Sequence, residues 1–137
     1  MPYKLLIVDD EEIVCESLST FIKWDMLGFE VVKCLMDGKN AIQYIEEHHV
    51  DVILTDIKMT FISGLELAYY VYKNKPQIKV VIISGYKDFE FARQAIKYKV
   101  VHYILKPIQI DELTQIFSEI KMQLDQEQKQ KESLNRE

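Results

Sequence analysis

Residues 4–12 read KLLIVDDEE, and this stretch decides the fold class. Its apolar run, from Leu5 to Val8, does not alternate apolar with polar side chains, which is typical of a parallel strand covered by helices on both faces. Four acidic residues follow directly. Four more short apolar runs recur between polar stretches, so we expect five strands, at residues 4–8, 30–35, 51–54, 79–83 and 101–105.

Between these runs the apolar residues return at helical spacing. A first helix is expected to bury Val14, Leu18 and Phe21, and Trp24 with Met26 should close the turn that follows it. The last helix has the clearest apolar stripe, which comprises Leu113, Ile116, Phe117, Ile120 and Leu124.

Residues that favour helix starts stand between the strands and helices. Asp37, Ser63 and Asp88 are expected to supply cap oxygens or negative charge to the first turns of the second, third and fourth helices. Strand and helix therefore alternate five times, which predicts an α/β fold, with a doubly wound, five-stranded parallel sheet. In such sheets the ligand site lies at the carboxyl ends of the strands.

The bulk composition limits the classes of function. A chain of 137 residues with 48% hydrophobic residues fits one domain, and its net charge of -5 argues against direct binding of nucleic acid. No apolar stretch is long enough to cross a membrane. Cys15 and Cys34 lack metal-ligand spacing, so they are expected to be small buried side chains in a reducing, cytoplasmic setting rather than a disulfide or a metal site.

Polar residues end four of the five expected strands. Asp9 and Asp10 follow the first, Asp56 the third, Ser84 the fourth and Lys106 the fifth. Three carboxylates brought together repel one another unless a cation compensates, and an all-oxygen ligand set favours Mg²⁺. Magnesium is commonly completed by a phosphate, so the site is expected to perform phosphoryl chemistry with a carboxylate nucleophile.

Each residue also has a plainer interpretation. Asp9 and Asp10 could be a helix cap and a solvated neighbour, and Lys106 could merely neutralise Asp56. Five suitable residues on four strand ends make that coincidence the weaker explanation.

Four motifs together resemble the response-regulator receiver domain of bacterial two-component systems. They are LLIVDDEE at 5–12, VILTDIKM with SGLEL within 52–67, ISG at 83–85 and ILKP at 104–107, and the resemblance covers residues 3–124. It implies a flavodoxin-like (βα)5 fold. It implies that Asp56 is the phosphoacceptor and that Lys106 pairs with the phosphoryl group. It implies that Mg²⁺ is held by Asp9, Asp10, Asp56 and the Lys58 backbone carbonyl. It also implies that Ser84 and Tyr103 are switch residues and that Pro107 follows a cis peptide bond.

The segment at residues 85–107 most resembles receivers fused to AraC-type DNA-binding domains. The resemblance implies a phosphoryl switch: a sensor histidine kinase phosphorylates Asp56, and the face of the fourth helix, fifth strand and fifth helix changes. If the chain forms a homodimer, we expect it to do so through that face, more strongly when phosphorylated. We divide the chain into a receiver domain at 1–124 and a charged helical extension or linker at 125–137 towards an output domain absent from this sequence, so that DNA would be reached only through that domain.

Departures from the family pattern fall at Thr60, where proline is common, and at Lys99, where glycine is common. A positive φ at Lys99 would strain its backbone.

Tyr86 and Lys58 are expected to overhang the phosphoryl group.

The chain is expected not to be an enzyme, while catalysing its own phosphorylation and dephosphorylation. Two alternatives stay open: an interaction module that works without phosphorylation, and a phosphohydrolase of the haloacid dehalogenase type, whose DxDx(T/V) loop is absent here.

Overall fold

The computed structural model describes residues 2–59, 61–85 and 89–135. Its strands form one parallel sheet in the order β2-β1-β3-β4-β5. The strands are β1 (Tyr3–Val8), β2 (Phe29–Leu35), β3 (Val52–Asp56), β4 (Lys79–Ser84) and β5 (His102–Leu105).

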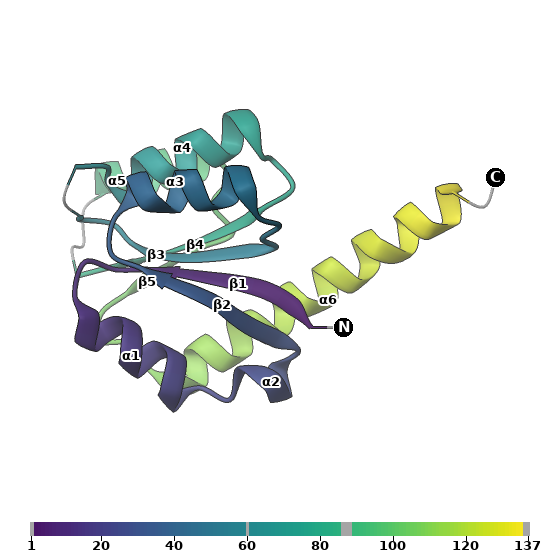
Figure 1. The fold of residues 1–137 in the computed structure, drawn as a ribbon, viewed down its shortest axis with the longest axis horizontal. Coiled ribbons are helices and arrows are strands. Elements are labelled where there is room, and N and C mark those ends of the chain that lie inside the picture. Colours follow the sequence, from purple (N-terminus) through teal and green to yellow (C-terminus); the bar gives the residue numbers. More distant parts are fainter. Residues whose placement is uncertain (1, 60, 86–88, 136–137) are drawn as a thin grey trace.

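Helices cover both faces of this sheet (Figure 1). Helices α3 (Gly38–Glu47), α4 (Gly64–Asn74) and α5 (Phe89–Lys97) lie on one face. Helices α1 (Glu12–Phe21), α2 (Trp24–Leu27) and α6 (Ile110–Asn135) lie on the other. The prediction of a doubly wound, flavodoxin-like five-stranded sheet is confirmed.

Each face has its own hydrophobic core. Leu5, Ile7 and Leu54 point to the α1 and α6 side, whereas Leu6 and Ile53 point to the α3, α4 and α5 side. All five side chains are fully buried. This division explains the lack of polar alternation in the sequence, since successive strand residues enter different cores and both need apolar side chains.

The strands that carry the candidate site run further than expected. We expected the third strand to end at residue 54, but β3 continues through Thr55 and Asp56, which pair with Ile82 and Ile83 of β4. The ladder depends on backbone groups, so polar side chains can extend a strand that their hydropathy does not reveal. Asp56 is thereby fixed at the last residue of a central strand.

The segment after α1 differs from the prediction. It forms a short extra helix, α2, in which Trp24 is buried and donates its indole N–H to the Leu18 carbonyl oxygen at 2.8 Å. The expected burial of Phe21 was wrong, because its side chain is 69% exposed, and the side chain of Met26, which we expected to close the turn, is 77% exposed. Trp24 and Phe29 on either side of Met26 fill the core instead.

Two of the predicted helix starts are confirmed. The Asp37 carboxylate accepts the Asn40 N–H at 2.7 Å, and Ser63 forms a reciprocal capping box with Glu66. Asp88 and Thr60 lie outside the described residues. Lys99 has φ 56°, so the expected strained, left-handed backbone is present at the end of the α5 segment.

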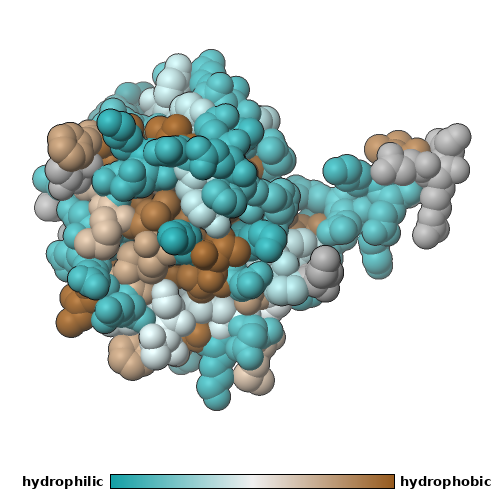
Figure 2. Space-filling model, viewed as in Figure 1, coloured by the Kyte–Doolittle hydropathy of each residue, from teal (hydrophilic) through white to brown (hydrophobic). Residues whose placement is uncertain are grey.

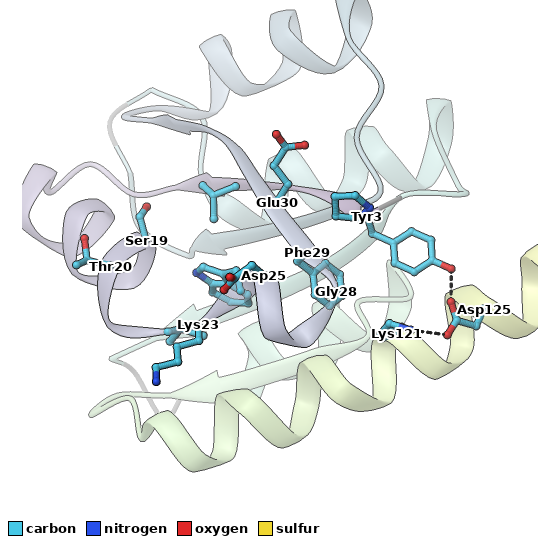
Figure 3. Close-up of a pocket in the computed structure, with 14 residues that line it drawn as sticks. Tyr3, Ser19, Thr20, Lys23, Asp25, Gly28, Phe29, Glu30, Lys121 and Asp125 are labelled. Carbon is cyan, nitrogen blue, oxygen red and sulfur yellow. Dashed lines mark hydrogen bonds and ion pairs between the residues drawn. The ribbon is translucent and has the colours of Figure 1, made fainter.

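At the amino ends of the strands, helix α6 leaves the domain. Asp125 of α6 accepts hydrogen bonds from the Tyr3 hydroxyl and, at 2.8 Å, from the Lys121 ammonium (Figure 3). Two residues further along α6, a Glu127 carboxylate oxygen lies 2.7 Å from the Lys79 ammonium. Leu124 is the last buried residue of the helix, and the projecting turns beyond it are mostly hydrophilic (Figure 2).

Among the described residues, none of the helices combines the length and the apolar content that crossing a lipid bilayer requires.

Candidate phosphoryl site

Three carboxylates meet at the carboxyl ends of β1 and β3. Oxygen atoms of Asp9, Asp10 and Asp56 all lie within 4.8 Å of one another. Asp9 and Asp56 are buried, whereas Asp10 is exposed at the mouth of the group. The sheet order places β1 beside β3, so residues 47 positions apart in the sequence converge.

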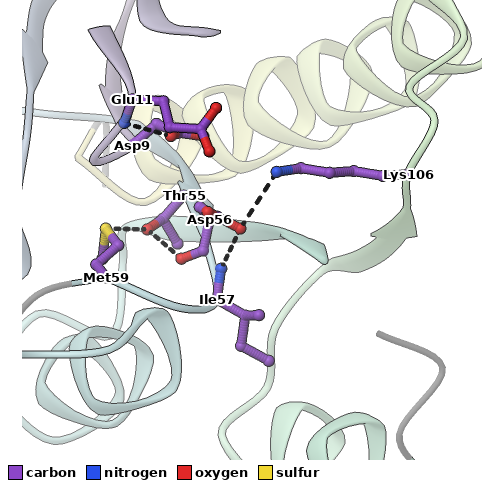
Figure 4. A network of polar contacts seen from close by, with 7 residues as sticks. All are labelled: Asp9, Glu11, Thr55, Asp56, Ile57, Met59 and Lys106. Atoms are coloured by element: carbon purple, nitrogen blue, oxygen red, sulfur yellow. Dashed lines mark hydrogen bonds and ion pairs between the residues drawn. The ribbon is translucent and has the colours of Figure 1, made fainter. Parts of the chain in front are cut away.

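Backbone and lysine contacts orient the Asp56 carboxylate (Figure 4). Its Oδ1 accepts the Ile57 N–H at 2.8 Å and lies 3.7 Å from the Lys106 Nζ. Asp9 is held in a similar way, since its Oδ1 accepts the Glu11 N–H at 2.9 Å. Both carboxylates therefore have a fixed direction before any ligand arrives.

Burial makes ionisation of Asp9 costly. It raises the pKa of Asp9 to about 6, and the neighbouring Asp56 and Asp10 charges raise it too, while the Glu11 N–H and the Lys106 ammonium lower it. Burial likewise raises the pKa of Asp56; Lys106 and the Ile57 N–H oppose this effect, and Asp10 with Glu11 add to it. The Lys106 ammonium thus offsets only part of the rise in the pKa of these two carboxylates.

The remaining predicted site residues come from β4, β5 and the segments that follow. Ser84 is fully buried as the last residue of β4, and its carbonyl accepts the Lys106 N–H at 2.8 Å. The Lys106–Pro107 peptide bond is cis. Tyr103 is half-buried on β5 against the α3, α4 and α5 core. Lys58 is exposed just beyond Asp56, and Tyr86 lies outside the described residues.

Two contributors escaped the sequence interpretation. Glu11 supplies the N–H that orients Asp9, and its charge raises the pKa of Asp56. Gly64 packs directly behind the site, where a Cβ atom would lie 2.2 Å from the Asp56 carbonyl oxygen. The DDEE run pointed to Glu11 in principle, whereas the Gly64 contact depends on tertiary packing that spacing does not reveal.

The donor set suits a hard divalent cation. Three carboxylates converge with a net excess of negative charge, and oxygen ligands favour Mg²⁺. Burial and neighbouring carboxylates raise the pKa of Asp9 and Asp56, so their ionised forms need compensation that a cation can supply. A cation here would favour the ionised form of each carboxylate.

The family model described as "Response regulator receiver domain" matches residues 5–118. The chain belongs to this family. Receiver domains of this kind act in two-component systems, and the predicted family is thereby confirmed.

Two proteins of similar sequence are transcriptional regulatory proteins. The chain is 35% identical over 125 residues to the transcriptional regulatory protein YesN of Bacillus subtilis, covering 88% of this chain and 34% of that protein. It is 31% identical over 128 residues to the transcriptional regulatory protein HptR of Staphylococcus aureus, covering 93% of this chain and 50% of that protein. The chain therefore spans about a third to a half of these relatives.

One solved structure has a similar fold over nearly the full length of both chains. The receiver domain of AraT from Geobacillus stearothermophilus superposes with a TM-score of 0.86 at 36% identity, over 93% of this chain and 99% of that one. A structure titled two component transcriptional regulator AraC, from Clostridium phytofermentans, is also among the similar structures. The predicted likeness to AraC-type regulators is confirmed.

One prediction is corrected by the family match. We expected a chain that is not an enzyme and yet catalyses its own phosphorylation and dephosphorylation, and these two statements contradict each other. The match supports a receiver domain and nothing about self-catalysis, so the combined statement was wrong. The match also places the chain in the receiver family rather than among phosphohydrolases of the haloacid dehalogenase type.

Proposed function

We propose that the chain is a phosphoacceptor switch, which takes a phosphoryl group from the phosphohistidine of a sensor kinase onto Asp56. One observation carries the proposal: three carboxylates lie within 4.8 Å of one another at the carboxyl end of a parallel sheet, with Lys106 beside the central one. Phosphoryl transfer gives each of the four groups a role, since carboxylates hold Mg²⁺ and supply the nucleophile while a lysine contacts the phosphoryl oxygens.

Asp9, Asp10, Asp56 and the Lys58 backbone carbonyl are the proposed Mg²⁺ ligands. When bound, the ion supplies positive charge that stabilises the oxygens of the phosphoryl group during its transfer. Burial is the main cause of the raised pKa of Asp9 and the neighbouring Asp56 and Asp10 charges add to it, so the ionised ligand set would need such a positive charge.

The Asp56 carboxylate is the proposed nucleophile. Its Oδ1 already accepts the Ile57 N–H and lies nearest Lys106, so we assign the attack to Oδ2. A new bond forms between Oδ2 and phosphorus, the bond from phosphorus to the histidine nitrogen breaks, and the electron pair leaves with the imidazole. The Lys106 ammonium offers a charge-assisted contact to a phosphoryl oxygen.

Signal output is assigned to Ser84 and Tyr103. The phosphoryl group draws the Ser84 hydroxyl towards it, Tyr103 turns inward, and the face of α5, β5 and α6 changes shape and pairs with a second copy. Such a switch needs two packings only a few kcal/mol apart. A Lys106→Ala variant should still be phosphorylated but should not dimerise further, as followed by sedimentation with and without phosphodonor.

The wider setting follows from the relatives, which are transcriptional regulators longer than this chain. We propose a cytoplasmic protein in which residues 1–124 form the receiver. Residues 125–137 then lead to an output domain, and DNA is reached only through that domain.

The test is intact-mass measurement after incubation with acetyl phosphate, with and without Mg²⁺. We expect a gain of one phosphoryl group in the wild type with Mg²⁺, none in Asp56→Asn, and an unchanged gain in Asp25→Asn, which removes an exposed carboxylate on α2. Labelling of Asp56→Asn equal to the wild type would overturn the site. No labelling of a folded wild type would favour a module that works without phosphorylation.

A further inference from the structure

Two cysteines that are far apart in the sequence meet behind the acidic cluster. Cys15 lies in the first turns of α1 and Cys34 in β2, where it pairs with Ile7 of β1. Both are free thiols, and both line one surface pocket beside Ser19. The expectation that each is simply a small buried side chain omits this proximity.

Ser19 completes the contact between the helix and the strand. Its hydroxyl donates to the Cys15 carbonyl oxygen at 2.8 Å and lies 3.5 Å from the Cys34 sulfur. The two thiols and this hydroxyl therefore form one small polar group between α1 and the edge strand. The Cys15 sulfur lies 3.9 Å from the carbonyl oxygen of Leu35, the residue after Cys34, so an approach of the two elements would bring the sulfurs to bonding distance, which is about 2 Å.

Solvent reaches this group through a surface pocket of about 520 Å³. Glu12, Glu16, Thr20 and Met36 line its mouth, and both cysteines line its interior. Cys15 is only 3% exposed, whereas Cys34 is half-buried. A small reagent therefore meets the Cys34 sulfur first.

We propose that Cys15 and Cys34 are a modification site that a low-molecular-weight disulfide oxidises to a reversible intramolecular disulfide. The Cys34 sulfur attacks the reagent, one sulfur–sulfur bond is exchanged for another, and one small thiol leaves with a proton. The Cys15 sulfur then attacks the Cys34 sulfur and displaces the second small thiol. The two cysteines lose two electrons and two protons, and the reagent gains both.

The cross-link would act on the acidic cluster from behind. The Cys15 sulfur lies 3.9 Å from the Asp9 carbonyl oxygen and 3.9 Å from the Leu35 carbonyl oxygen, and the Asp9 N–H donates to the same Leu35 oxygen at 3.0 Å. Drawing Cys15 towards Cys34 therefore displaces the backbone that carries Asp9. This consequence rests on the proposed function, because it concerns Mg²⁺ at that carboxylate.

The experiment uses the whole chain and cystamine, a small disulfide whose positive charges suit the two glutamates at the pocket mouth. The wild type should lose the mass of two hydrogen atoms without keeping an adduct, and dithiothreitol should restore both thiols. Cys15→Ala should stop at one stable adduct on Cys34, and Cys34→Ala should not react while folded.

A stable adduct on Cys34 in the wild type would overturn the proposal, as would reaction only after denaturation. Both readings come from the wild type and do not depend on how the variants fold. The oxidised protein should then bind Mg²⁺ about tenfold more weakly than the reduced protein, the size typical of disturbing a ligand's support. If the disulfide forms and Mg²⁺ affinity is unchanged, the link to Asp9 is wrong. If neither form binds Mg²⁺, the proposed function itself fails.

Discussion

The two ends of the parallel sheet handle charge in opposite ways. At the amino end, Lys79 meets Glu127 at 2.7 Å and Lys121 meets Asp125 at 2.8 Å, so each acidic side chain has a basic partner. At the carboxyl end, Asp9, Asp10 and Asp56 cluster, and the Lys106 ammonium lies 3.7 Å from Asp56. The amino end contributes to holding α6 in place, whereas the carboxyl end keeps an imbalance that a cation and a phosphoryl group can use.

Removing one charge from the carboxyl end should stabilise the protein in the absence of metal. One pKa unit is about 1.4 kcal/mol, so the rise of the Asp9 pKa from 3.8 to about 6 corresponds to a cost of roughly 3 kcal/mol at pH 8. Asp9→Asn should therefore raise the free energy of unfolding at pH 8 by up to that amount, as measured by urea denaturation with EDTA present.

The pH dependence gives the sign of this effect. Asp9 in the folded protein binds its proton more tightly than in the unfolded chain, so the cost is fully present above pH 6 and disappears as the pH falls below about 4. The increase in the free energy of unfolding caused by Asp9→Asn should therefore become smaller as the pH falls from 6 to about 4. A variant that is equally stable to the wild type at pH 8 would show that the carboxyl end is already balanced.

The backbone behind Asp56 should tolerate no extra atom. In Gly64→Ala the new Cβ would lie 2.2 Å from the Asp56 carbonyl oxygen, and backbone on both sides must move. We expect a loss of about 2 kcal/mol in the free energy of unfolding. Gly85→Ala is the matched control, because among the described residues its Cβ would meet only the Lys106 side chain, at 3.9 Å, and its effect should be much smaller.

The amino end should respond weakly to the loss of a charge. Lys79→Met removes the partner of a half-exposed Glu127 carboxylate, so we expect a loss of about 0.5 kcal/mol. Faster hydrogen exchange in α6 after residue 124 should accompany it, with exchange in β3 unchanged. A loss as large as that of Gly64→Ala would mean that the two ends do not differ as described.

The sequence predicted those parts of the molecule that depend on local chemistry. The short apolar runs located all five strands, and Asp37 and Ser63 marked helix starts because a cap depends on residues three positions apart. Asp9, Asp10 and Asp56 were found because parallel strands bring their carboxyl ends to one edge.

What escaped prediction depends on packing between distant segments. Nothing near Phe21 or Met26 shows that Trp24 takes the buried place. The packing of Gly64 behind Asp56, and the placing of Cys15 and Cys34 in one pocket, bring different elements together, and neither spacing nor composition encodes this without the fold.

The most direct test of the unbalanced carboxyl end is the free energy of unfolding as a function of Mg²⁺ concentration at pH 8. A ligand that binds only the folded state at one hundred times its Kd adds about 2.7 kcal/mol. We predict a rise of this kind for the wild type and a much smaller one for Asp10→Asn. Wild-type stability that is the same in EDTA and in saturating Mg²⁺ would contradict the assignment of these three carboxylates to a metal.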